Sequence, residues 1–162
     1  MVGITRGCTV LVVAAMARNS RQFSEIVIWP FETRGIALTG DSLVEGTTEA
    51  AANIYEAVDG GVRMAIVGGG DGPLRAILPL FTRRAVLLGV LLPGTANNFA
   101  RSKGWPMDFA TAVDVITDGT ESRVDVGLLN GIPCANNLPI GYSREVIRAT
   151  PVGMKRWLAS TR

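Results

Sequence analysis

Three short, nearly continuous apolar runs constrain the fold of this chain more than any other feature. They span residues 9–15, 62–67 and 85–92 and are rich in leucine and β-branched residues. Runs of this length and composition are typical of strands that are covered on both faces of a parallel sheet, and they are too short to cross a membrane. A weaker run at residues 35–39 is a candidate fourth strand.

Patterns typical of helices lie between and after these runs. Apolar residues recur at the spacing of an amphipathic helix in residues 51–58, 74–81 and 109–116. We expect Thr47 or Thr48 to cap the first helix and Asp108 to cap the third. The alternation predicts an α/β fold, a Rossmann-like doubly wound parallel sheet whose ligands bind beyond the carboxyl ends of its strands.

The pattern changes after Gly119. Two short strand-like segments flank Asn130-Gly131, the residue pair that favours a type I′ hairpin turn. We therefore expect an α/β domain over residues 1–120 and the beginning of an incomplete β-rich domain over residues 121–162. A hairpin without the rest of its sheet has exposed edges, which predicts pairing with another copy of the chain, a homo-oligomer, or poor solubility.

Composition excludes several classes of function. The chain has no histidine, which excludes a Ser/His/Asp triad and most zinc sites, and its net charge of +2 without long charge runs argues against nucleic-acid binding. The two cysteines, Cys8 and Cys134, form no CxxC motif and lie in apolar surroundings, so we expect buried, reduced thiols. Residues 6–17 resemble a signal peptide, but we interpret them as a buried first strand of a cytoplasmic protein.

The first glycine turn, residues 68–72, follows a predicted strand and precedes a helical stripe that starts at Leu74. Glycines let the backbone approach a phosphate, and the N–H groups at a helix start favour an anion. Pro73 suits the first turn of that helix. Asp71 would hold phosphate poorly, so we expect it to face Mg²⁺ carried by a nucleotide, or a hydroxyl. The alternative is a purely structural turn, because neither GxxxxGK[ST] nor GxGxxG is present.

A second glycine turn ends the next predicted strand. It has the sequence LPGTANNFAR, residues 92–101, with Thr95 as the expected helix cap and Asn97 and Asn98 in the first turn. If the two strands are neighbours, the turns form one crevice, with Asp71 on one side and Thr95, Asn97 and Asn98 on the other. Capping of the helix start is the alternative role of the two asparagines.

Four motifs together resemble one known family. They are GGDG at residues 69–72, LPGTANNFAR at 92–101, VDVGLLNG at 124–131 and IGYSREV at 140–146. In order and spacing they resemble the diacylglycerol kinase catalytic family, which includes bacterial lipid kinases, sphingosine kinases and, more distantly, NAD kinases. The resemblance implies an ATP-binding α/β domain followed by a β-rich domain. It implies transfer of the ATP γ-phosphoryl group to a lipid hydroxyl at the membrane surface.

The resemblance also implies roles for individual residues. The implied nucleotide contacts come from both turns: Gly69, Gly70, Asp71, Gly72, Gly94, Thr95, Asn97 and Asn98. Asp71, Asn98 and Asp125 would form a Mg²⁺-linked cluster in which Asp71 and Asp125 are catalytic. Without the resemblance, Asp125 is simply a solvent-facing residue of a strand, pointing away from its apolar neighbours.

The chain departs from the family pattern at several positions. Family members usually have Thr, Glu and Asp at the positions of Pro73, Ala76 and Asn98, and Asn-Pro where this chain has Ala15-Met16. They are roughly twice as long, as two domains require. The general base and most of the lipid site therefore fall outside these residues. The sequence predicts a truncated lipid kinase, with an inactive nucleotide-binding module or a kinase with a non-lipid acceptor such as NAD as alternatives.

Overall fold

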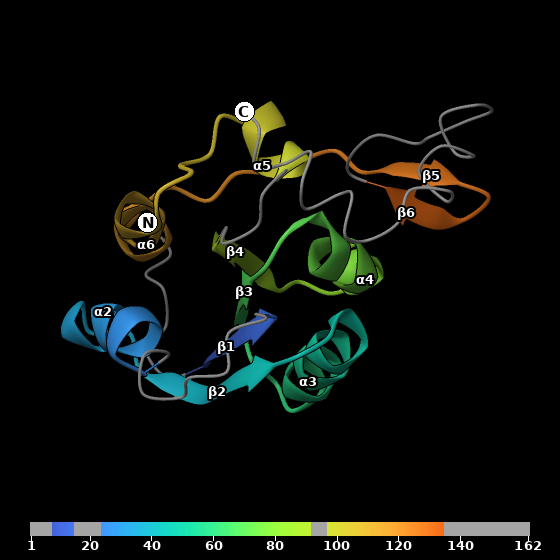
Figure 1. Ribbon diagram of the computed structural model, residues 1–162. Coiled ribbons are helices and arrows are strands. Elements are labelled where there is room, and N and C mark those ends of the chain that lie inside the picture. The colour runs from blue at the N-terminus through green and yellow to red at the C-terminus, as the bar shows by residue number, and fades with distance from the viewer. Residues whose placement is uncertain (1–7, 15–23, 92–96, 135–162) are drawn as a thin grey trace.

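The computed structural model describes residues 8–14, 24–91 and 97–134 (Figure 1). Its centre is a sheet of four parallel strands in the order β2-β1-β3-β4. The strands are β1 (Thr9–Ala14), β2 (Leu38–Val44), β3 (Met64–Gly68) and β4 (Leu87–Leu91). Every residue of β3 is buried and β1 is buried up to Val13, as nearly continuous apolar runs predict.

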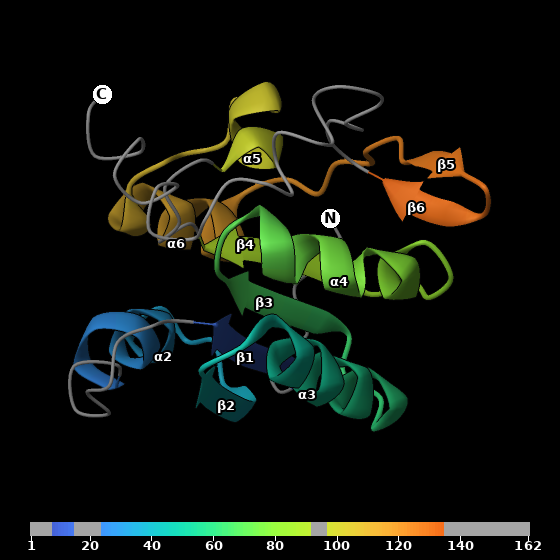
Figure 2. The same ribbon diagram turned by 45° about the vertical axis from the view of Figure 1, so that its right-hand side comes forward.

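Helices cover both faces of this sheet (Figures 1 and 2). On one face lie α3 (Thr47–Asp59) and α4 (Asp71–Phe81), whose apolar stripes form one buried cluster with Val10, Val12 and Val67. On the other face lie η1 (Ser24–Ile28), α2 (Trp29–Thr33) and α6 (Phe109–Asp118). The short α5 (Asn98–Ser102) follows the second glycine turn. The predicted α/β class with a doubly wound sheet is confirmed.

The strand order places a topological switch point between β1 and β3. From β1 the chain continues to β2 on one side, whereas from β3 it continues to β4 on the other side. In open α/β sheets, ligands bind outside the carboxyl ends of the strands at such a point. The GGDG turn follows the carboxyl end of β3 directly, so the fold places it where a ligand site is expected.

A small antiparallel hairpin follows the α/β layers. It consists of β5 (Gly127–Leu129) and β6 (Ile132–Cys134), and β6 lies against α4 (Figure 2). Asn130 and Gly131 have φ values of 51° and 76°, as the predicted type I′ turn requires. The predicted hairpin is confirmed, whereas the division into domains at residue 120 stays a prediction.

Several element boundaries differ from those that the sequence predicts. The weak run at residues 35–39 contributes only its end to β2, which continues to Val44 because β1 pairs with it over that length. The cap residue of α3 is Gly46, and Thr47 is already helical, so neither threonine is the cap. The elements η1 and α2 were not predicted at all. Cys8 and Cys134 are free thiols but half-buried rather than buried.

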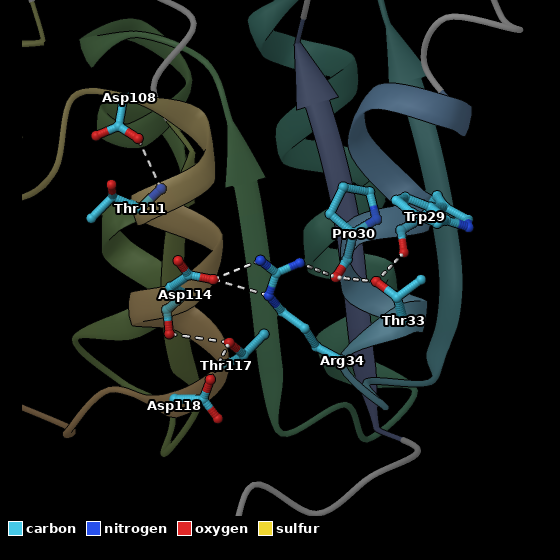
Figure 3. Close-up of polar contacts among 9 residues, drawn as sticks. All are labelled: Trp29, Pro30, Thr33, Arg34, Asp108, Thr111, Asp114, Thr117 and Asp118. Atoms are coloured by element: carbon cyan, nitrogen blue, oxygen red, sulfur yellow. Dashed lines mark hydrogen bonds and ion pairs between the residues drawn. The ribbon is translucent and has the colours of Figure 1, made fainter.

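Arg34 connects α2 to α6 across one face of the sheet (Figure 3). Its Nε and Nη2 donate to Asp114 Oδ1 at 3.0 and 2.7 Å, and its Nη1 donates to the carbonyl oxygen of Pro30 at 3.0 Å. The pair is largely exposed, and exposed ion pairs contribute little stability. The packing of α2 and α6 therefore depends on the apolar residues of the buried cluster that the two helices share, among them Phe31 and Val113.

Asp108 caps α6, as the sequence predicts. We expect the stability that this cap contributes to decrease in acid. Its Oδ1 accepts the backbone N–H of Thr111 at 2.9 Å, and this hydrogen bond holds the pKa of Asp108 below its ordinary value of 3.8. A lowered folded-state pKa stabilises the fold above the ordinary value, and this contribution is lost as pH falls through the lowered pKa. Asp108→Ala is expected to lower Tm by a few degrees near neutral pH, with a smaller deficit at about pH 3.

The control for this prediction is Asp108→Asn, because asparagine also caps a helix but does not titrate. Its Tm near neutral pH is expected to match the parent, and its acid loss to be smaller. Circular dichroism melts of the three proteins at both pH values check this. An Asp108→Ala protein that melts with the parent near neutral pH would show that the cap contributes nothing.

Candidate functional site

The GGDG turn follows β3 directly, and its backbone requires glycine at the first position. Gly69 has a φ of 154°, and its N–H donates to the carbonyl oxygen of Leu91 at the end of β4, at 3.0 Å. A Cβ at position 69 would lie 3.0 Å from Cγ of Pro73. A side chain here would meet both strain and crowding, so glycine sets the path of the turn.

The turn delivers the chain into the N-terminus of α4. Gly70 is the N-terminal cap residue and has an extended backbone conformation. The first three helical residues are Asp71, Gly72 and Pro73. The N–H groups of Asp71 and Gly72 have no partner within the helix, and none is found for them elsewhere among the described residues. They are available to an anion, whereas Pro73 has no N–H to donate.

Asp71 joins the first glycine turn to the start of α5. Its Oδ2 accepts the backbone N–H of Asn98 at 3.0 Å and the side-chain Nδ2 of Asn98 at 3.3 Å. Its Oδ1 accepts the backbone N–H of Phe99 at 3.1 Å. Because β3 and β4 are neighbours, as the crevice prediction requires, the carboxylate reaches the first residues of α5. The start of α4 and the start of α5 therefore meet at one side chain.

Asn97 and Asn98 differ in environment. Asn97 has only 1% of its surface exposed and occupies the left-handed region, with φ 46° and ψ 43°. It is the cap residue of α5, but its side chain makes no capping hydrogen bond, so its conformation rather than its amide suits this position. Asn98 is exposed and faces Asp71. The predicted cap Thr95 is thus wrong, since the cap residue is Asn97; Gly94 and Thr95 themselves lie outside the described residues.

Asp125 does not lie on a strand, which corrects the prediction. Residues 120–126 are neither helix nor strand, because β5 pairs with β6 only from Gly127. Asp125 is exposed between half-buried Val124 and Val126, so the expected alternation is present without the strand. Asp125 has no hydrogen bond to Asp71 or Asn98 among the described residues. Its place in a shared cluster stays a prediction.

The polar groups at the starts of α4 and α5 fit a cation that arrives with a nucleotide better than a metal site built by the protein alone. The described residues contain no group of three or more His, Cys, Asp or Glu side chains suited to a metal. A carboxylate has about four acceptor positions, and three donors already face Asp71. One position remains, and Mg²⁺ usually takes one or two carboxylates together with substrate phosphates.

The structure brings one further residue close to the start of α4. Thr47, the first residue of α3, has its Oγ1 3.6 Å from the point where a Cβ on Gly72 would lie. It is exposed, so its hydroxyl borders the start of α4. Sequence reasoning assigned it only a capping role. Nothing in the local sequence signals its position, because β2 and α3 bring it there through long-range contacts.

Comparison with known proteins identifies the family. The model of the diacylglycerol kinase catalytic domain matches residues 14–129. The chain belongs to this family. A diacylglycerol kinase from Staphylococcus saprophyticus is 32% identical over 127 residues, covering 77% of this chain and 40% of the relative. A Pseudomonas syringae protein named "Probable lipid kinase YegS-like" is 36% identical over 114 residues, which are 68% of this chain and 36% of the relative.

Solved structures of the diacylglycerol kinase family share the fold. A diacylglycerol kinase from Bacillus anthracis superposes with a TM-score of 0.63 at 23% identity, over 77% of this chain and 43% of that chain. The chain thus spans about two fifths of the length of the relatives it matches. No helix in the described parts of the chain has the length and apolar character to cross a bilayer.

Proposed function

We propose that this chain binds Mg²⁺–ATP in the crevice between the start of α4 and the start of α5, as the nucleotide-binding part of a diacylglycerol-kinase-type phosphotransferase. The observation that carries the proposal is the contact of Asp71 with Asn98 and Phe99 beside the available N–H groups of α4. The family relationship supports a lipid kinase-like role. Nucleotide and cation are our inference from the site.

The backbone at the start of α4 is proposed to hold the phosphates. The N–H groups of Asp71 and Gly72 point out of the N-terminus of an 11-residue helix, where the helix dipole also favours negative charge. Gly72 is exposed and has no side chain to keep phosphate oxygens away. The first N–H groups of α5 are already used by Asp71. We therefore assign phosphate contacts chiefly to α4.

Asp71 is proposed to meet the cation that accompanies the nucleotide. Its remaining acceptor position and the amide oxygen of Asn98 are the oxygen ligands at the starts of α4 and α5. Asp125 is proposed as a further carboxylate ligand on the family resemblance alone. When bound, Mg²⁺ supplies charge neutralisation on the transferring phosphoryl group. The chain's own part is to position the phosphates, so that the γ-phosphate is held in one orientation.

The acceptor is proposed to be a lipid hydroxyl reached at a membrane surface. This rests on the family, whose matched members include proteins named diacylglycerol kinase. Phosphoryl transfer depends mostly on positioning and electrostatic stabilisation, with a base that orients the acceptor. We assign that base to none of the described residues.

Calorimetric titration of the 162-residue chain tests the cation role of Asp71. Asp71→Asn is expected to weaken binding of Mg²⁺–ATP about tenfold more, equal to about 1.4 kcal/mol, than it weakens binding of ATP in EDTA. Asp59→Asn is the matched control, because Asp59 is an exposed carboxylate at the end of α3, paired with Arg84 at 2.9 Å. Equal losses with and without Mg²⁺ would contradict the cation role.

A nucleotide-binding module without catalytic activity is the second candidate. The observation that favours it is the position of Pro73 as the third residue of α4, where it removes one donor from the phosphate site. Transfer of labelled γ-phosphate from ATP to diacylglycerol in detergent micelles separates the two. Turnover by this chain excludes the inactive module, and nucleotide binding without turnover supports it.

A further inference from the structure

We infer that Asp71 is also a positioning residue, which fixes the start of α5 against the start of α4. We also infer that the amide at position 98 lets it do so without a cation. The proposed function assigns Asp71 to the nucleotide and its cation. This inference adds a role within the protein that is present before any ligand binds. Only the relation of this positioning role to the nucleotide site rests on the proposed function.

The first two residues of α5 donate hydrogen bonds to one carboxylate, that of Asp71. Asp71 accepts three hydrogen bonds, two backbone and one side-chain, at 3.0 to 3.3 Å. A helix of five residues is far too short to be stable alone. Its own cap residue, Asn97, makes no side-chain capping bond. The capping function at α5 is therefore carried out by a residue of α4.

The side chain of Asn98 is a neutral amide, so its contact with Asp71 contains only one negative charge. Nδ2 of Asn98 donates to Oδ2 of Asp71 at 3.3 Å, so the two side chains attract each other. An aspartate at position 98 would put a second carboxylate beside the first, and like charges this close disfavour each other's ionised form. Such a pair needs a cation or a shared proton between its members. Asparagine at this position removes that need.

Trp105 makes the contact observable. The ring of Phe99, whose N–H donates to Asp71, is buried and packs edge-on against Trp105, with centroids 5.2 Å apart. Undocking of α5 would expose Trp105 to water and shift its emission to the red. The chain has three tryptophans, so Trp29→Phe and Trp157→Phe together give a parent in which Trp105 is the only emitter.

The experiment compares four variants in this parent background, with emission and thermal melts recorded in EDTA and in millimolar MgCl₂, without nucleotide. Asn98→Asp adds the second carboxylate, and Asp71→Asn removes the first. The double variant Asp71→Asn, Asn98→Asp exchanges the two groups. Asn98→Ala removes only the side-chain donor and keeps both backbone donors, so it gives an answer even where a charged variant folds poorly.

The parent is expected to give the same emission and Tm in EDTA and in Mg²⁺. Asn98→Asp should be red-shifted and less stable in EDTA, and Mg²⁺ should restore it. Asp71→Asn should be red-shifted in both buffers. The exchanged double variant should lie closer to the parent than either single variant, since one amide again faces one carboxylate. Asn98→Ala should show a small loss that Mg²⁺ does not change.

Three results would overturn the inference. One is an Asn98→Asp protein that matches the parent in EDTA, and another is a parent whose emission and Tm respond to Mg²⁺ as Asn98→Asp does. The third is additivity of the two single variants in the double variant. Because no nucleotide is present, failure of the chain to bind ATP would leave this result intact, so the two proposals fail separately.

Discussion

Replacing Phe31 with alanine is expected to lower the free energy of unfolding by about 3–5 kcal/mol, the usual cost of removing a fully buried aromatic side chain. Phe31 is 0% exposed although α2 is only five residues long. It packs in the cluster that joins β1 and β3 to α6, with Leu11, Ile66 and Val113. Removing its ring leaves a cavity between α2 and the sheet. Urea unfolding followed by circular dichroism measures the loss.

Trp29→Ala is the matched control for this prediction. Trp29 is an aromatic residue of the same helix but is 63% exposed. We expect its substitution to change the free energy of unfolding by no more than about 0.5 kcal/mol. Similar losses in the two variants would contradict the assignment of Phe31 to the core.

Gly68→Ala is expected to lower the free energy of unfolding by about 1–3 kcal/mol through overpacking. Gly68 is the last residue of β3 and lies opposite Val13 of β1. A Cβ on Gly68 would lie 2.6 Å from Cγ2 and 2.9 Å from Cγ1 of Val13, so one strand must move. Since the GGDG turn begins at the next residue, we expect nucleotide binding to weaken as well. Urea unfolding and calorimetry of the same samples measure both effects.

Two companion variants separate crowding from loss of backbone freedom at Gly68. Gly40→Ala, in β2 of the same sheet, places its Cβ 3.8 Å from Val10, an ordinary contact, and is expected to be neutral or slightly stabilising. The double variant Gly68→Ala, Val13→Ala should lose less than the sum of its two single variants, because the branched carbons are gone. A fully additive pair would show that Val13 is not the obstacle.

Much of the fold can be predicted from the sequence, and the exceptions have physical causes. Long apolar stripes predict α3, α4 and α6, and continuous apolar runs predict three strands, because burial of one or both faces of an element gives its sequence a recognisable apolar pattern. The sequences of η1 and α2 have no such pattern. They are five residues each, and α2 contains Pro30 and has no side-chain cap at its start. Their stability comes from tertiary contacts such as those of Phe31, which a local pattern does not carry.

The candidate site shows the same division. Glycine-rich turns after neighbouring strands could be predicted to meet, because parallel strands end at the same edge of a sheet. The direction of the Asp71 side chain could not, since it depends on how α5 is placed against α4. The assignment of Asp125 to a strand was wrong because pairing with β6 begins only at Gly127, two residues later.

Nuclear magnetic resonance of the labelled 162-residue chain tests the central claim most directly, by locating the nucleotide. On titration with Mg²⁺–ATP, we expect saturable shifts of the backbone amides at the start of α4 and α5, above all those of Gly70, Asp71, Gly72 and Asn98. The hairpin turn at Asn130-Gly131 should respond little. A folded sample whose spectrum does not change at millimolar Mg²⁺–ATP, or changes only away from these two helix starts, would contradict the account.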